Sequence, residues 1–423
     1  MRFSPASTDR EGAKEGGFYP AYVLALLSTV YFLYLLDRTA IMITQELIKA
    51  EFRLSDTQMG LLIGAVYGIS YGLAGLPIGW LVDRLKRRNM LVFILSVWSG
   101  LTAACGLSSS YLHLLIVRVG VGATEAGGAP TSLSILSDLY PPERRATVSS
   151  IFFSGTNVGM IVSFFVGGLV AREFGWRAVF LLYGLPGLLL ALVILLTVRE
   201  PVRHGRPVAI ERREGILRSA GRVLSTPYAG GIYIGSVLYS ASTAAFGGWM
   251  IAFLMRTHHL DVATAGTIIA ATLGVCGIVG TVAVGILADR ARARGVGGPM
   301  LVVGGTAFIS LLAATVALHA ADLRIVVAAL AVYGLTVSAY AGPTVATLSH
   351  VVAPINRGMA FALYTLLANL VGGMGPLIVG MISDGPAHGQ LAIAIQVMLL
   401  VNLAGGLCCL WVGKALNRQQ AAE

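Results

Sequence analysis

Four ionisable side chains stand inside long apolar runs of this sequence. Asp37 and Arg38 are neighbours in one run, and Arg118 and Glu125 lie seven residues apart in another. Burying an unpaired charge in such a run costs several kcal/mol, so each of these residues is a candidate for function. An acid that exchanges a proton, beside an arginine that then changes its partner, has the chemistry of proton coupling and of a conformational switch.

Helix geometry allows these side chains to meet. Seven residues make almost two turns, so Arg118 and Glu125 share one helix face, with Glu125 about 10.5 Å deeper in its run. Asp37 and Arg38 lie about 10–12 Å from the outer end of their own apolar run. We therefore predict one network that responds to protons and substrate. The alternative is a static set of ion pairs that fixes helix register, but four charges in two runs exceed what packing needs.

The composition places these runs in a membrane. Of the 423 residues, 56% are hydrophobic and only 12% are charged, which is too apolar for soluble domains. A membrane-spanning helix needs about 20 mainly apolar residues. This criterion predicts an all-α integral membrane protein with twelve spans, near residues 20–45, 55–82, 88–109, 112–138, 144–171, 176–199, 228–256, 262–287, 298–320, 323–350, 356–383 and 388–414.

The positive charges orient the predicted spans. With both termini in the cytoplasm, 22 of the Lys and Arg residues fall on the cytoplasmic side and 6 on the outer side. This asymmetry satisfies the positive-inside rule. The formal net charge of +10 is therefore a signal of orientation, and no nucleic-acid partner is expected.

The chain repeats itself once. GWLVDRLKRR at 79–88 matches GILADRARAR at 285–294 at an offset of 206 residues, and PPERRATVSS around Arg145 matches APINRGMAFA around Arg357. This pattern predicts a parallel six-plus-six duplication with substrate near the midplane. The predicted parts are an N-tail (1–19), a first six-helix half (20–199), a cytoplasmic linker (200–227), a second six-helix half (228–414) and a C-tail (415–423). The linker is predicted to contain a surface helix at 210–225.

The repeated basic loop is a candidate cytoplasmic gate. An Asp at the end of the second helix can cap a helix of the other half and pair with an Arg, which would hold the inner side shut while the outer side is open. Gly79 would permit close helix approach. Simple charge anchoring explains the lysine and some arginines, but not an acid that occurs in both copies. The predicted gate residues are Gly79, Asp83, Arg84, Arg87, Asp289 and Arg290.

Taken together, these motifs resemble the major facilitator superfamily over the whole chain. The Gly-x-x-x-Asp-Arg-x-x-Arg-Arg loop at 79–88 is that superfamily's signature. Within it the chain is similar to the bacterial branch of the Spinster family of sphingosine-1-phosphate and lysophospholipid transporters. That similarity lies in LLDRTAI (35–41), LSDTQMGLL (54–62), VWSGLTAACGL (97–107), RVGVGATEAGGAPTSLSILSDLYPPERRA (118–146), GWRAVFLLYGLPG (175–187) and VREP (198–201).

The resemblance implies that the first and fourth helices line a central cavity and that Asp37, Arg38, Arg118 and Glu125 are working residues. It implies a secondary transporter for an amphipathic or lipid-like solute in the bacterial inner membrane. The charged network predicts proton coupling, and facilitated transport is the alternative. The organic-anion branch, which carries sugar acids, has a similar Leu-Asp-Arg-Thr. The Glu125-Ala126-Gly127 and Trp98-Ser99 stretches favour Spinster.

Uncharged polar and aromatic residues complete the predicted cavity. Several of them could equally join helices to one another. They are Tyr67, Tyr71, Asn157, Trp249, Tyr340, Tyr364 and Asn369. The histidines stand in loops or near span ends, and neither HExxH nor a P-loop occurs, so no catalytic residue, no metal and no cofactor is expected. The expected partners are membrane lipids and a small amphipathic substrate, and we expect a monomer.

Overall fold

The computed structural model describes residues 17–200, 216–337, 340–385 and 390–422. Every regular element in these ranges is a helix, which confirms the all-α prediction. The α-helices are α1 (Phe18–Phe52), α2 (Asp56–Gly60), α3 (Val66–Arg84), α4 (Arg87–Gly106), α5 (Tyr111–Glu125), α6 (Gly128–Leu139), α7 (Arg145–Thr197), α8 (Ile216–Leu224), α9 (Ala229–Thr257), α10 (Val262–Ile269), α11 (Cys276–Arg292), α12 (Gly298–His319), α13 (Leu323–Val337), α14 (Ala341–Val351), α15 (Arg357–Asp384) and α16 (Leu391–Ala422).

Four shorter helical turns connect these elements. Two are π-helical, η1 (Leu61–Ala65) between α2 and α3 and η3 (Ala270–Val275) between α10 and α11. Two are 3₁₀ turns, η2 (Pro142–Arg144) and η4 (Pro354–Asn356). The π-turns therefore interrupt corresponding helices of the two repeats.

Ten of the described helical segments are long and apolar enough to cross a membrane. The sequence prediction of twelve spans differs from this count at two places. Residues 145–197 form one continuous element, but Gly175 inside it has φ 79° and ψ 171°, so two helical stretches meet there. Residues 112–138 are divided between α5 and α6, each shorter than a span.

The interruption between α5 and α6 follows directly from the sequence after Glu125. Pro130 has no N–H to bond the carbonyl of Ala126, and Gly127 and Gly128 favour leaving the helix. A Cβ on Gly128 would press on the indole of Trp98, so this glycine also lets the break approach α4. The chain therefore turns immediately after a buried acid.

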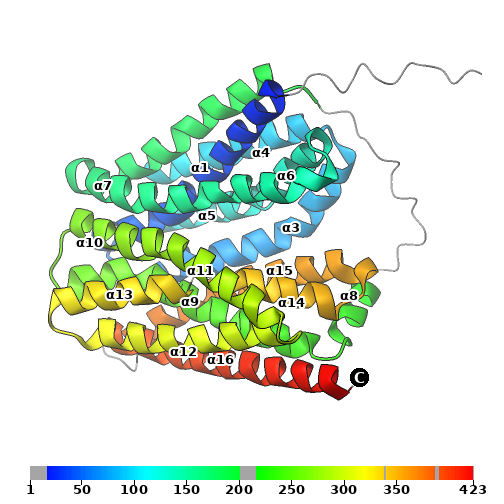
Figure 1. Cartoon of the computed structure of the whole chain (residues 1–423). Coiled ribbons are helices and arrows are strands. Elements are labelled where there is room, and N and C mark those ends of the chain that lie inside the picture. The colour runs from blue at the N-terminus through cyan, green and yellow to red at the C-terminus, as the bar shows by residue number, and fades with distance from the viewer. Residues whose placement is uncertain (1–16, 201–215, 338–339, 386–389, 423) are drawn as a thin grey trace, which may run out of the picture.

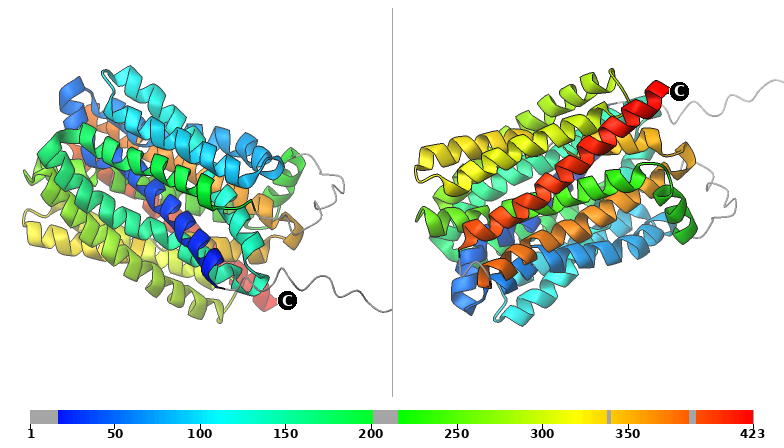
Figure 2. Two further views of the ribbon diagram at one scale, coloured as in Figure 1. Left: turned by 90° about the horizontal axis from the view of Figure 1, so that it is seen from above. Right: turned by 90° about the horizontal axis from the view of Figure 1, so that it is seen from below.

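The helices pack in two groups (Figure 1). Helices α1 to α7 form the N-terminal group and α9 to α16 the C-terminal group, and all of the long helices run roughly along one axis (Figure 2). The groups meet along two seams, α15 against α2, η1 and α3, and α10 with η3 against α7. We call the end that carries α8, η2 and η4 the linker end, and the opposite one the far end.

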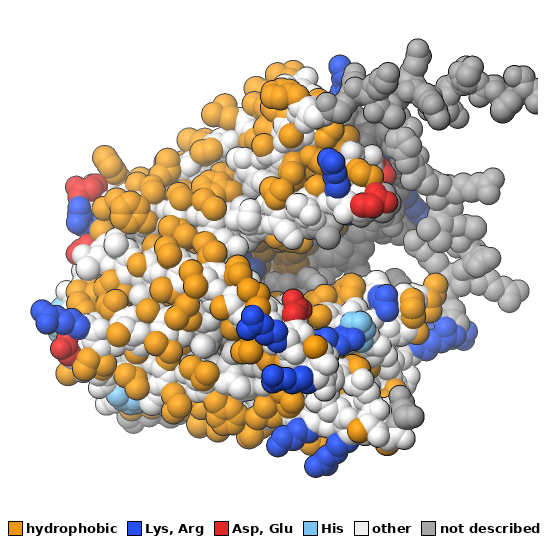
Figure 3. All heavy atoms as spheres, viewed as in Figure 1, with side chains coloured by type: hydrophobic (Ala, Val, Ile, Leu, Met, Phe, Trp, Pro, Cys, Tyr) orange, Lys and Arg blue, Asp and Glu red, His pale blue; other side chains and the backbone are white. Residues whose placement is uncertain are grey.

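The outer surface matches a lipid environment. Large hydrophobic side chains cover the flanks, whereas Lys, Arg, Asp and Glu gather toward the two ends (Figure 3). Two clusters of buried apolar side chains fill the interior. The smaller lies within the N-terminal group around Trp98 and Phe152, and the larger joins both groups around Phe246 and Trp249.

Bare backbone forms part of the seam between the continuous segment α2, η1 and α3 and the helix α15. A Cβ at Gly60, Gly64 or Gly68 would collide with backbone atoms of α15, at Pro376, Gly373 and Asn369 respectively. These glycines stand four residues apart and so share one helix face. Only glycine permits this distance between the two backbones.

Replacing Gly64 with alanine is expected to lower stability. The added methyl meets backbone and the ring of Pro376, neither of which can rotate away, so overpacking should cost about 1–3 kcal/mol. Thermal unfolding of the purified protein measures the effect. The matched control is Gly305→Ala in α12, where a Cβ meets no atom within 4 Å. Equal midpoints for the two variants would contradict the prediction.

Candidate functional site

The four charged residues predicted to work together lie in the interior of the N-terminal group. Asp37, Arg118 and Glu125 are at most 1% exposed, and Arg38 is half-buried. No ion pair within 4.0 Å joins any two of these four described side chains. The structure brings them together as a cluster whose members make different contacts.

Asp37 and Arg38 face different neighbours because adjacent helical residues do not share a face. The carboxyl of Asp37 faces Trp98 and Thr102 of α4, and neither of its oxygens receives a hydrogen bond of good geometry. A carboxyl group without donors is costly to bury as an anion. Asp37 is therefore a buried acid whose oxygens have no donor of good geometry in this conformation.

Arg38 connects to Glu125 through two tyrosines. Its Nη1 donates to the hydroxyl of Tyr34 at 3.0 Å. The hydroxyl of Tyr67 lies 3.2 Å from that of Tyr34 and donates to Oε2 of Glu125 at 2.7 Å. The guanidinium of Arg38 also lies over the ring of Tyr67, 5.0 Å from its centre. Tyr34 was not among the residues predicted from the sequence.

Arg118 is held by weaker contacts. Its Nη1 donates to the backbone carbonyl of Asp37 at 3.4 Å, and its guanidinium lies 5.8 Å from the ring centre of Tyr67. Its Nε and Nη2 have no hydrogen-bond partner within the described structure. Tyr67 thus lies between two guanidinium groups.

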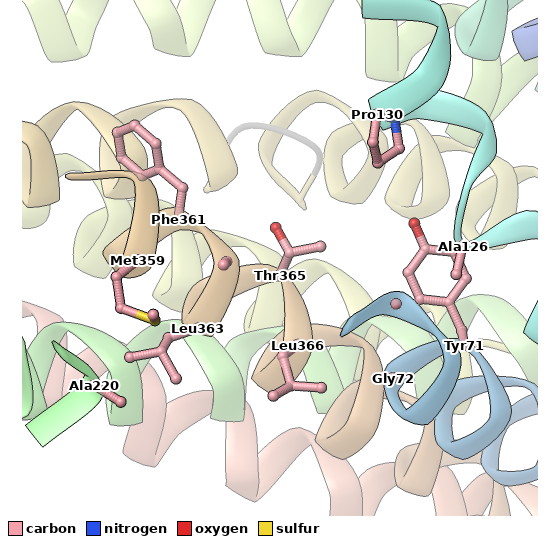
Figure 4. Close-up of a pocket in the computed structure, with 12 residues that line it drawn as sticks. Tyr71, Gly72, Ala126, Pro130, Ala220, Met359, Phe361, Leu363, Thr365 and Leu366 are labelled. Atoms are coloured by element: carbon pink, nitrogen blue, oxygen red, sulfur yellow. The ribbon is translucent and has the colours of Figure 1, made fainter. Parts of the chain in front are cut away.

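A cavity of about 480 Å³ opens between the two groups toward the linker end. Figure 4 shows Tyr71, Ala126 and Pro130 on one side of it, and Met359, Phe361 and Leu363 toward the other. Apart from the side chains of Tyr71 and Thr365, its lining residues are Gly, Ala, Pro, Met, Phe and Leu. The cavity is therefore almost wholly apolar.

A second, smaller cavity of about 50 Å³ lies one to two helical turns closer to the charged cluster. Arg38, Tyr67, Ser240 and Asn369 contribute its polar lining. The two cavities follow the same pair of helices, α3 and α15, because Tyr67 is one turn from Tyr71 and Asn369 one turn from Thr365. The small cavity with Arg38 in its lining thus lies along the same helices as the apolar cavity.

The other predicted cavity residues lie elsewhere. Trp249 is fully buried and its indole N–H donates to the carbonyl of Pro376 at 2.9 Å, so it joins α9 to α15. Asn157 is exposed, Tyr340 stacks on Tyr239, and Tyr364 is buried. None of these four lines either cavity. Within the described ranges no group of His, Cys, Asp or Glu has the form of a metal site.

The sequence model of the Major Facilitator Superfamily matches residues 27–376 and 232–422. The chain belongs to this superfamily. The resemblance seen in the sequence is confirmed, and its relatives are transporters.

Curated relatives of this transporter include an MFS-type efflux pump of Mycolicibacterium smegmatis, 28% identical over 98% of this chain and 96% of the pump. A hexuronate transporter of Bacillus subtilis is 27% identical over 89% of this chain and 93% of its own. A probable galactarate/D-glucarate transporter of B. subtilis is 25% identical over 66% of each.

Among solved structures, the transporter is similar to a bacterial homologue of the human lysosomal transporter Spinster. In its inward-facing, unoccupied conformation that protein gives a TM-score of 0.84 at 25% identity, covering 95% of this chain and 98% of its own. In its inward-facing, occupied conformation the TM-score is 0.79 at 26% identity, with coverage of 96% and 98%.

The predicted gate residues of this transporter lie at the linker end. Arg87 is buried and pairs with Asp138 of α6, while Glu200 accepts hydrogen bonds from the backbone N–H groups of Arg87 and Arg88 and so caps α4. These bonds lie within the N-terminal group. In this conformation Arg87 therefore joins helices of one group to each other.

The remaining predicted gate residues also lie at the linker end. Arg84, Asp289 and Arg290 are exposed, and a Cβ on Gly79 would meet no atom within 4 Å. The side chain of Asp83 lies outside the described part of the structure. The closing role of this loop stays a prediction for the opposite conformation.

An ionic cluster at the far end was not identified from the sequence. Arg256 at the end of α9 donates to Glu46 of α1 at 2.7 Å and to Asp56 of α2 at 2.8 Å. Asp56 also pairs with Lys49 and accepts from Ser383 of α15 at 2.6 Å. We call Glu46, Lys49, Asp56, Arg256 and Ser383 the far-end lock, because its bonds join the two groups.

Helix caps reinforce this closure. The carboxylate of Asp384, at the end of α15, accepts from the backbone N–H groups of Asp56 and Thr57 at 3.0 and 2.7 Å. At the other seam Asp261 caps α10 and lies 3.9 Å from Arg172 of α7. Hydrogen bonds from Thr264 foremost lower the pKa of Asp261, so it stays ionised near neutral pH.

Proposed function

We propose that the protein is a secondary active transporter that moves an amphipathic or lipid-like organic solute by alternating access, coupled to protons. One observation carries the proposal: an almost wholly apolar cavity and a small cavity whose lining includes Arg38 follow the same two helices. An acyl chain fits the first and an anionic or polar head the second. Glu125, linked to Arg38 through hydroxyls, supplies an acid that can carry the coupling proton.

We further propose twelve spans in two six-helix halves, residues 20–199 and 228–414, with the linker 200–227 and the tails 1–19 and 415–423 in the cytoplasm of a bacterium. Treating α7 as two spans that meet at Gly175, and α5 with α6 as one broken span, raises the ten segments to twelve. The excess of Lys and Arg at the linker end supports its cytoplasmic placement in the inner membrane. We propose that it acts as a monomer with lipid around it.

Alternating access is supported by the asymmetry of the two ends. The far-end lock and the glycine contacts hold the groups together at one end, while the cavity separates them at the other. This arrangement corresponds to an inward-facing state. The similar Spinster homologue was also solved in inward-facing conformations.

A sugar-acid symporter is the second candidate. Relatives named for hexuronate and for galactarate or D-glucarate support it. Arg38 and Asn369 in the small cavity could hold such an acid. Against it, most of the cavity wall offers no hydrogen-bonding group to the hydroxyls of a sugar.

Uptake into proteoliposomes tests both candidates. Radiolabelled lysophosphatidylethanolamine, sphingosine and D-glucarate would each be supplied with an imposed pH gradient, with the reverse gradient and with none. We expect gradient-dependent movement of a lipid and none of D-glucarate. Movement of D-glucarate alone would overturn the lipid proposal, and transport indifferent to pH would overturn proton coupling.

Replacing Asp83 with alanine is expected to favour inward opening, because the acid would no longer hold the linker end shut in the outward-facing state. The ratio of cysteine labelling at the linker end to that at the far end measures the change. The matched control is Glu143→Ala, which removes an exposed acid at the same end that is not among the predicted gate residues. An unchanged ratio in Asp83→Ala would refute the gate role.

A further inference from the structure

We infer that Tyr67 is a positioning residue of the coupling site, and that Tyr67 and Tyr34 transmit the protonation of Glu125 on α5 to Arg38 on α1. The inference rests on the proposed coupling role of Glu125. It gives a role in coupling to Tyr67, which was predicted only as cavity lining, and to Tyr34, which was not predicted from the sequence.

The contacts form one unbranched chain across three helices. Tyr67 is 2% exposed, and its hydroxyl lies 2.7 Å from Glu125 and 3.2 Å from the hydroxyl of Tyr34. Tyr34 in turn accepts from Arg38 at 3.0 Å. The guanidinium groups of Arg38 and Arg118 lie 5.0 and 5.8 Å from the ring centre of Tyr67. The ring is therefore packed against both arginines.

Each phenol carries a single hydrogen, and this fixes the direction of the chain. An ionised Glu125 can only accept, so the single hydrogen of Tyr67 goes to it, while Arg38 donates to Tyr34. The contact between the two hydroxyls, in which Tyr67 is the donor, is then not made as a hydrogen bond. This arrangement holds Arg38 toward Tyr34.

Protonation of Glu125 reverses the direction of its hydrogen bond with Tyr67. The new O–H of the carboxyl donates to Tyr67, whose own hydrogen turns to Tyr34. The oxygen of Tyr34 then accepts from both Tyr67 and Arg38, and the bond to Arg38 weakens because it is shared. No covalent bond changes other than the one that the arriving proton makes. Arg38, which lines the small cavity, becomes freer to bind a substrate head group.

Other groups act on Glu125 and must remain in place for a clean test. They belong to four helices: Tyr31, Tyr34, Asp37 and Arg38 on α1, Tyr67 and Tyr71 on α3, Cys105 on α4, and Arg118 on α5. Removing a single hydroxyl from Tyr67 leaves all of these side chains present.

The test uses the proton itself as the probe, so it needs no substrate. Infrared difference spectra of the full-length protein record the C=O stretch of protonated Glu125 as pH is changed, and loss of the band in Glu125→Gln identifies it. In Tyr67→Phe the midpoint of this pH profile should move to higher pH by about one to two units, because the carboxylate loses a hydrogen bond. Tyr34→Phe should move the midpoint to lower pH, because it removes the acceptor that Tyr67 uses when Glu125 is protonated.

Tyr233→Phe is the matched control. It removes a buried phenol of the C-terminal group that donates to the carbonyl of Ala360 in the same group. Its midpoint should equal that of the wild type. A Tyr67→Phe profile equal to that of the wild type would overturn the inference. A band that shifts in Tyr67→Phe, together with transport that ignores pH, would instead leave the relay standing and reject the proposed coupling.

Discussion

Replacing Glu125 with glutamine is expected to abolish accumulation driven by a pH gradient, at least tenfold below wild type, while substrate exchange at equal pH persists. Glutamine has nearly the shape of glutamate, and its carbonyl can still accept from Tyr67, so the fold should survive. It cannot take up a proton. The accumulation ratio in proteoliposomes measures the first effect, and counterflow of the same solute measures the second.

Glu51→Gln is the matched control for this substitution. It changes a carboxylate at the far end that pairs with Arg177 inside the N-terminal group, away from the cluster. Accumulation should be unaffected in Glu51→Gln.

Asp37→Asn is expected to behave like Glu125→Gln if both acids carry protons. Accumulation and pH dependence that survive in Glu125→Gln would exclude the charged cluster as the coupling site.

Replacing Arg256 with glutamine should shift the transporter toward the outward-open state. Arg256 is the cation that joins α9 to two carboxylates of the other group, and Asp56 among them is almost fully buried. Truncating one partner of such a pair costs about 2–3 kcal/mol, or roughly 30- to 150-fold in the equilibrium between states. The cost falls only on the state in which the far-end lock is formed.

Spin labels on exposed far-end positions of the two groups, Glu173 and Thr257, would report the opening as a longer distance between them. Glu51→Gln again serves as the control, because the Glu51 and Arg177 pair lies within one group. Its distance distribution should match that of the wild type. A distribution in Arg256→Gln that stays at the wild-type distance would show that the lock does not hold the far end closed.

Much of the charged cluster could be predicted because charged residues are rare inside membrane-spanning segments. Asp37, Arg38, Arg118 and Glu125 stand out against apolar neighbours, and helical spacing placed Arg118 and Glu125 on one face. The superfamily was equally accessible, since its basic loop occurs twice. Hydrophobic length alone located most of the spans, including the turn at Gly175.

The partners of those charged residues could not be predicted from the sequence in the same way. Tyr34 belongs to an aromatic and apolar run in which nothing marks a hydroxyl that bonds another helix. The far-end lock joins Asp56 to Arg256, 200 residues apart. Arg256 had been counted only among the positive charges of the outer side, and Asp56 stood only within the LSDTQMGLL motif. Contacts at such separation depend on how the two groups dock, which a single sequence does not encode in any local spacing.

The glycine face formed by Gly60, Gly64 and Gly68 on α2, η1 and α3 has a consequence for the speed of the transport cycle. These glycines lie against the backbone of α15 and the ring of Pro376, so no long side chain is interlocked at these three positions. The surfaces can therefore separate there without rotamer changes. This part of the seam should add little to the activation energy of opening, which should come from the buried apolar cluster that joins both groups and from the polar bonds at the far end.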